Sequence, residues 1–306
     1  AAAVLSLVQL ACVVLAVWVA TRLERRLVVT GALRAERDTL RPVRTGRDKV
    51  LVAASLGGLG LFLGLPLAVL VERSLAAGDG YGFDAYRALA EPTSVLLAAP
   101  WEAVVNSIVY AAAASVIAIV VGGLAAFAVA DARGSRLLDL LVLIPLGASA
   151  VMLGLGFLIA FDTPPLDLRT APWIVPVAQA LVAIPFVVRI MVPTLRSIDP
   201  RLREAAALLG ATPARVRREV DLPIVARGLA VAAGFAFAIS LGEFGATVFL
   251  ARPDRPTLPV AIFRFLGRPG EVNVAQAYAL AVVLMGVTIV SVLLVERIRL
   301  RRGGWF

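Results

Sequence analysis

Long apolar runs separated by short charged segments set the pattern of this chain. Runs without charge, or with a single charge, cover residues 1–21, 51–71, 103–130, 140–161, 170–188, 228–251 and 272–295. Each is close to the ~20 residues that a helix needs to cross the hydrocarbon core of a bilayer. The pattern therefore predicts an all-α, polytopic membrane protein in which one isolated span precedes a bundle of six helices.

The basic side chains predict how these spans are oriented. The chain holds 30 Lys and Arg against 21 Asp and Glu, and the excess is concentrated in short segments between the apolar runs. Since cytoplasmic loops carry more Lys and Arg than external ones, residues 22–49, 196–223 and 300–306 are expected inside the cell. The position of the arginines in such loops argues against nucleic-acid binding, although the net charge is +9.

Two external loops leave alternatives open. The aromatic residues within 73–101 suit an amphipathic helix at the outer interface as well as they suit a plain loop. The loop 252–271 is more basic than the orientation rule predicts. Either it folds back towards the pore, or the topology differs at this point.

The residue types exclude most catalytic and metal chemistry. The sequence has no His, and its one Cys, Cys12, lies in an apolar run, so no disulfide, metal site or His-based catalysis is expected. Its one Lys, Lys49, does not follow a glycine-rich phosphate-binding loop. The chain is therefore not expected to be an enzyme or to hold a cofactor, and any energy that it uses must come from a partner.

The stretch 199–223 carries the signals of two short helices outside the bilayer. Asp199 before Pro200 is a helix start, because Asp accepts free backbone N–H groups and Pro loses no hydrogen bond at the first helical position. Gly210 is a natural left-handed stop. Thr212 before Pro213 repeats the starting signal, and the second helix leads back into an apolar run.

This stretch also resembles the EAA signature of bacterial ABC importer permeases. That signature reads Glu-Ala-Ala, three residues, Gly, nine residues, then Ile, any residue, Leu and Pro; with Val220 for Ile, the matching positions are Glu204, Ala205, Ala206, Gly210, Leu222 and Pro223. An Ala-rich helix ended by Gly is the alternative for the triplet alone. The resemblance implies a coupling helix in a groove of a cytoplasmic ATPase, with Glu204 as charged contact and Gly210 as turn. Further pairs on the ATPase would come from Arg215, Arg217 and Arg218.

The same resemblance implies an organisation for the chain. Residues 1–21 would be the last helix of a preceding permease half and 22–49 a basic linker, so the chain is expected to be the C-terminal half of a fused two-half permease. Residues 50–299 would form the six-helix permease domain, with the coupling loop at 196–223 and a cytoplasmic tail at 300–306.

The implied location is the bacterial cytoplasmic membrane, and the implied partners follow from it. They are a cytoplasmic ABC ATPase dimer, a second permease half, membrane lipid, and a periplasmic or lipid-anchored substrate-binding protein. Nucleic acid is not among them.

The segment 240–247, SLGEFGAT, points to a branch of these importers. It resembles the thiamine, ferric-iron, sulfate and molybdate permeases, as do Thr257, Leu258, Pro259, Gln276 and Ala277. Thiamine or ferric iron is the expected substrate, because fused permeases are common in those two groups; sulfate or molybdate is the alternative. The sequence shows no ion site of its own, as expected if an external binding protein selects the substrate.

Four residues are candidates for the substrate pathway, namely Asn106, Arg189, Glu243 and Phe244. Asn106 begins an Asn-Ser pair that resembles the start of the first core helix in this family. Glu243 interrupts an apolar run, where a charge is costly unless it faces water, a partner or the outer headgroups. Arg189 either reaches the inner interface with its long side chain or lines the pathway. A secondary transporter, the competing class, usually needs coupling-ion carboxylates at mid-membrane, for which Glu243 is the one candidate.

Overall fold

The computed structural model describes residues 45–77, 80–131, 149–163, 167–168 and 171–301, together with positions 12, 15, 19 and 145. Apart from those four positions, the predicted isolated span 1–21, nearly all of the linker 22–49 and the first part of the span 140–161 lie outside the described residues. The first described helix begins at Gly46, inside the segment assigned to the linker.

Six apolar helices make up most of the described chain, and they confirm the predicted all-α, polytopic class. They are α3 (Gly46–Leu75), α5 (Pro100–Asp131), α7 (Ala150–Ala160), α8 (Ile174–Arg196), α11 (Leu222–Leu241) and α14 (Glu271–Arg301). Among the described residues, α3, α5, α8 and α14 are each long and apolar enough to cross a membrane. Two segments that meet inside α11, Pro213–Ala226 and Gly228–Leu241, give a fifth span if they are counted together, and they are bent by 60°.

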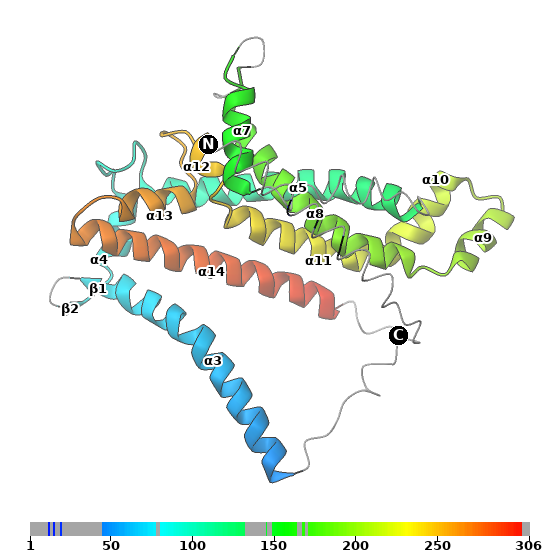
Figure 1. The fold of residues 1–306 in the computed structure, drawn as a ribbon, viewed down its shortest axis with the longest axis horizontal. Helices are drawn as coiled ribbons and strands as arrows, with labels where there is room; N and C mark the ends of the chain where they lie inside the picture. Colours follow the sequence, from blue (N-terminus) through cyan, green and yellow to red (C-terminus); the bar gives the residue numbers. More distant parts are fainter. Residues whose placement is uncertain are drawn as a thin grey trace.

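Helices α5, α8 and α11 lie alongside one another at the centre of the bundle (Figure 1). The core between them is rich in alanine, with Ala118, Ala183 and Ala236 fully buried. A Cβ added at Gly122 of α5 would lie 3.0 Å from the Cβ of Val187 in α8. Because lipid tails are as apolar as the helices, small residues that permit close van der Waals contact hold such helices together.

The short elements gather at opposite ends of this bundle. Figure 1 shows one end formed by β1 (Ala76–Ala77), β2 (Gly80–Tyr81), α4 (Asp84–Arg87), α12 (Thr247–Leu250) and α13 (Leu258–Leu266). Helices α9 (Pro200–Leu208) and α10 (Pro213–Val216) project at the other end, where the π-helical turn η2 (Arg217–Asp221) leads into α11. We call the first the α12–α13 end and the second, which is formed by α9, α10 and η2, the hairpin end.

The chain departs from the predicted spans in two places. The run 228–251 is not one helix, because α11 ends at Leu241 and α12 begins only at Thr247. Two glycines lie in the interruption between them, where they lower the helix propensity. The span predicted to end at residue 188 continues as a helix to Arg196, so Arg189 lies inside α8.

Both loops for which the sequence left alternatives open fold onto the bundle. Leu89, in the 3₁₀ turn η1 (Ala88–Ala90) of the first loop, shares a buried cluster with Phe265 of α13. The second loop contacts the helices through α13, whose Leu258 and Phe265 lie in the same buried cluster. Its Arg252 pairs with Asp254 at 3.0 Å, and this hydrogen bond lowers the pKa of the Asp254 carboxyl.

Candidate functional site

The chain between α9 and α10 turns through a left-handed glycine. Gly210 has a φ of 84°, a conformation that glycine adopts without steric cost. Its N–H donates to the Ala207 carbonyl at 2.9 Å, and the N–H of Ala211 donates to the Ala206 carbonyl at 3.0 Å. Together these bonds form a Schellman motif, which ends α9 and satisfies its last carbonyls. The predicted left-handed stop at Gly210 is confirmed, and we call residues 200–221 the hairpin.

Both helices of the hairpin begin at the predicted caps. Asp199 accepts a hydrogen bond from the N–H of Arg201 at 3.0 Å, and Thr212 accepts one from the N–H of Arg215 at 3.4 Å. A proline follows each cap at the start of the helix. Local sequence signals therefore determine the shape of the hairpin.

An ion pair that sequence reasoning missed ties the two arms together. The Nε of Arg203, in α9, donates to Oδ1 of Asp221, at the end of η2, over 2.7 Å. The Asp221 side chain is 6% exposed and that of Arg203 33% exposed. Asp221 occupies a position where the EAA signature accepts any residue, so the motif carried no signal for this contact.

The remaining signature residues mostly face outwards. Glu204 and Ala205 are exposed and Ala206 is half-buried. The two leucines that precede Gly210, Leu208 and Leu209, are 88% and 89% exposed. Exposed apolar surface next to polar residues is a candidate interaction site.

The basic residues predicted to pair with an ATPase lie on the second arm. Arg215 donates to Glu219 at 3.0 Å, while Arg217 and Arg218 are exposed. Leu222 and Pro223, which close the signature, are also exposed at the first turn of α11. The structure thus brings all nine predicted coupling residues into the hairpin and the turn that follows it.

The other candidates lie apart from the hairpin, and Glu243 is the most constrained of them. It is 7% exposed. Its Oε1 accepts from the N–H of Ala246 at 2.7 Å and its Oε2 from the N–H of Thr247 at 3.1 Å. The Thr247 hydroxyl donates in return to the Glu243 carbonyl at 2.8 Å. Glu243 is therefore buried within the chain, where its charge is stabilised by backbone N–H groups.

Asn106 and Phe244 both reach the segment around α13. The side-chain amide of Asn106 donates to the Pro256 carbonyl at 3.3 Å, and the hydroxyl of Ser107 accepts from the Leu258 N–H at 2.6 Å. Phe244 lies against Phe263, with ring centroids 5.2 Å apart. Arg189 is not part of this group: it is exposed on α8, in the part of that helix nearer the hairpin end.

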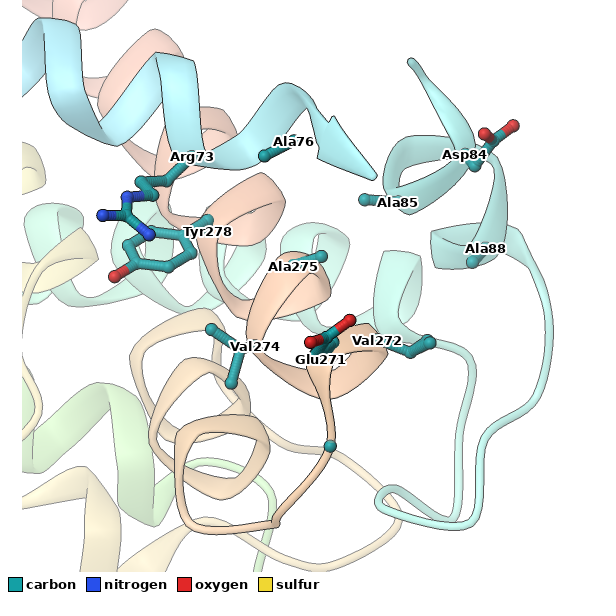
Figure 2. Close-up of a pocket in the computed structure, with 11 residues that line it drawn as sticks. Arg73, Ala76, Asp84, Ala85, Ala88, Glu271, Val272, Val274, Ala275 and Tyr278 are labelled. Atoms are coloured by element: carbon teal, nitrogen blue, oxygen red, sulfur yellow. The ribbon is translucent and has the colours of Figure 1, made fainter. Parts of the chain in front are cut away.

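A cavity of about 820 Å³ opens at the α12–α13 end, between α3, α4 and the start of α14 (Figure 2). Its polar lining comes from Arg73, Asp84, Glu271 and Tyr278. None of the four predicted pathway residues lines it. The cavity therefore does not coincide with the site that the sequence indicated.

A family comparison decides the class of the protein. The family described as binding-protein-dependent transport system inner membrane component matches residues 114–302. The chain belongs to this family. It is a permease subunit of an ABC importer of the inner membrane, a transport component and not an enzyme.

Curated relatives agree with this assignment. The permease protein PhnV of Salmonella paratyphi A, whose name assigns it to 2-aminoethylphosphonate transport, is 32% identical over 84% of this chain and 97% of its own length. The sulfate transport permease CysT of Salmonella typhimurium is 31% identical over 56% of this chain and 65% of its own. The molybdenum transport permease ModB of Haemophilus influenzae is 37% identical over 39% of this chain and 52% of its own.

Solved structures show the same fold. A bacterial alginate ABC transporter, crystallised with an alginate pentasaccharide-bound periplasmic protein, matches with a TM-score of 0.64 and 18% identity. The match covers 83% of this chain and 96% of the other. At this identity the likeness establishes the permease architecture and leaves the substrate open.

Proposed function

We propose that this chain forms one half of the pathway of an ATP-driven importer for a small tetrahedral oxyanion, and that the hairpin is the docking surface for the cytoplasmic ATPase. The exposure of Leu208 and Leu209 carries the docking proposal. An exposed apolar pair next to exposed Glu204 offers a partner both a hydrophobic anchor and a charged contact. The Schellman motif and the Arg203–Asp221 pair keep this surface in shape.

The orientation of the hairpin is part of the proposal. Arginines are frequent between residues 196 and 227, which favours the cytoplasmic side. The α12–α13 end would then face the periplasm, where a binding protein delivers the substrate. The alginate transporter, with its periplasmic protein, is a precedent for such a complex.

The substrate class rests on the relatives. PhnV, CysT and ModB are named for 2-aminoethylphosphonate, sulfate and molybdenum transport. Sulfate and molybdate each have four oxygens around a tetrahedral centre, and a phosphonate group has three oxygens and one carbon around a tetrahedral phosphorus. The three relatives are not named for thiamine or iron, so the sequence-based preference for those substrates gains no support from them.

A second permease half is the expected partner within the membrane. None of the apolar window of α3 is buried within the described chain, and only 11% of that of α14 is buried. These faces need lipid or another permease half to cover them. Whether that half belongs to the same polypeptide or to a separate subunit is answered by the composition of the purified complex.

The docking surface can be tested with the reconstituted transporter. Leu208→Ser and Glu204→Ala should abolish transport coupled to ATP hydrolysis while the protein remains in the membrane. Leu97→Ser is a matched control, because Leu97 is 80% exposed but follows η1 at the α12–α13 end. Normal co-purification of the ATPase and normal transport by Leu208→Ser would rule out docking through this surface.

The substrate class can be tested without the membrane complex. Calorimetry of the partner binding protein with 2-aminoethylphosphonate, sulfate, molybdate, thiamine and ferric iron should give tight binding for one of the first three. Tight binding of thiamine or ferric iron alone would replace the oxyanion proposal.

A further inference from the structure

The interruption between α11 and α12 is fixed from within by Glu243. Both oxygens of its carboxylate accept backbone hydrogen bonds, from Ala246 at 2.7 Å and Thr247 at 3.1 Å. A carboxylate that accepts the free N–H groups of a turn stabilises that turn and is itself stabilised. Because the backbone already binds this charge, Glu243 is poorly placed to bind substrate.

The interruption is also fixed from outside, by α7. A Cβ at Gly245 would lie 2.9 Å from the Cβ of Ala150, and a Cβ at Gly154 would lie 2.6 Å from the Cα of Ala246. Only glycine fits at either position without displacement of the backbone. Residues 243–247 are thus clamped between their own carboxylate cap and a neighbouring helix.

Phe244 is the side chain held by this clamp. Its ring lies against that of Phe263 in α13, with centroids 5.2 Å apart and planes tilted by 51°. Tilted aromatic pairs of this kind are favourable. Phe263 is 57% exposed, so the pair lies at the surface of this chain and not in its core.

The location of the pair points to the transport pathway. Non-helical backbone at membrane depth is tolerated where it is buried in protein or lines a water-filled cavity. In transporters, interrupted helices line the route of the substrate. Within the interruption Glu243 and Ala246 are buried, whereas Phe244 is half-buried and its ring lies against the exposed Phe263.

We propose that the Phe244–Phe263 pair closes the transport pathway at the α12–α13 end, and that Glu243 is the positioning residue that holds Phe244 in place. An apolar constriction of this kind blocks small ions because water leaves it. The inference rests on the proposed function for one premise, namely that the α12–α13 end faces the periplasm.

Passive leak measures the closure directly. The complete transporter, in proteoliposomes loaded with radiolabelled sulfate and without ATP, should retain the label. Phe263→Ala should release it roughly two- to tenfold faster, the shift expected when one aromatic pair is lost. Phe263→Tyr keeps the ring and should retain sulfate. Phe249→Ala is the matched control, because Phe249 is 37% exposed in α12 and outside the ring pair.

The role of Glu243 is tested in the same assay. Glu243→Ala should leak as Phe244→Ala does, whereas Glu243→Gln keeps one acceptor oxygen and should leak less. If Glu243→Ala instead retained sulfate but raised the KM for uptake of 2-aminoethylphosphonate or sulfate, Glu243 would be a substrate contact and the positioning role would be wrong. If Glu243→Ala does not assemble, sulfate release from Glu243→Gln is compared with release from the wild type. Faster release supports the positioning role, and equal release contradicts it.

Unchanged release from both Phe244→Ala and Phe263→Ala would overturn the closure. This outcome is distinct from a failure of the proposed function. Leak requires neither ATP nor a recognised substrate, so a transporter whose hairpin does not dock an ATPase would still give an interpretable result.

Discussion

Glu204 and Glu243 occupy similar short motifs rich in Ala and Gly, but the structure gives them opposite surroundings. Glu204 is exposed on the hairpin, and its carboxylate makes no hydrogen bond or ion pair with the part of the chain that the structure describes. Glu243 is 7% exposed, and both of its carboxylate oxygens accept backbone hydrogen bonds.

The contrast separates two uses of an acidic residue in an apolar chain. A carboxylate that caps backbone N–H groups belongs to the fold, since its removal leaves buried donors without partners. A carboxylate that faces solvent contributes little to the fold and is available to another protein. Stability measurements on matched variants can therefore tell the two apart before any transport assay.

The largest effect is expected from Glu243→Ala. Two buried N–H groups would lose their acceptor, at roughly 1–3 kcal/mol each, so the free energy of unfolding should fall by about 2–6 kcal/mol. Glu204→Ala should change it by less than ~0.5 kcal/mol. Thermal unfolding of the purified protein in nanodiscs would measure both. Equal melting temperatures for the two variants would contradict the conclusion that Glu243 stabilises the fold and Glu204 does not.

A somewhat smaller effect is expected where α7 meets the interruption. Gly154→Ala would place a Cβ 2.6 Å from the Cα of Ala246 and should destabilise the protein by about 1–3 kcal/mol. Gly156→Ala is the control in the same helix, because no other group lies within 4 Å of the place that its new methyl group would take. There the higher helix propensity of Ala should stabilise by up to ~1 kcal/mol. The same melting assay would show shifts of opposite sign.

On the hairpin, the backbone of Gly210 is more sensitive than any exposed side chain. Gly210→Ala forces a Cβ into the left-handed region and should cost about 1–2 kcal/mol. Gly210→Asn should cost less, because Asn tolerates this conformation better. Hydrogen exchange of the α9 amides would report the loosening. If the α9 amides of both variants exchanged as slowly as those of the wild type, the Schellman motif would not determine the stability of this helix.

The smallest effect is expected at the exposed ion pair of the second arm. The Arg215 and Glu219 side chains are 64% and 58% exposed, so Arg215→Ala should cost no more than about 0.5 kcal/mol and less still in high salt. Arg203→Ala should cost several times more, because it leaves the 6% exposed Asp221 without its partner. Chemical denaturation in low and high salt would rank the two.

The hairpin could be predicted from sequence because its signals are local. Asp199, Thr212 and Gly210 each act on backbone groups within a few residues, and the structure shows those contacts. The long apolar helices were predictable for the same reason, since length and hydropathy alone decide them.

The interruption after α11 could not be predicted in this way. Glu243 caps N–H groups that become free only once the chain has left the helix, and Gly154, which makes room for Ala246, is far away in the sequence. The Arg203–Asp221 pair likewise joins residues on different arms of the hairpin. Apolar patterning therefore indicated one continuous span where the fold has two helices and a clamp.

A bend inside α11 changes the direction of the helix that leads out of the hairpin. Pro213–Ala226 meets Gly228–Leu241 at 60°, and the Arg203–Asp221 pair fastens α9 to the first of these segments. A movement along the axis of Pro213–Ala226 then has a smaller component along the axis of Gly228–Leu241 and a larger component perpendicular to it. If the hairpin docks the ATPase as proposed, this geometry favours tilting of the membrane helix over movement along its axis.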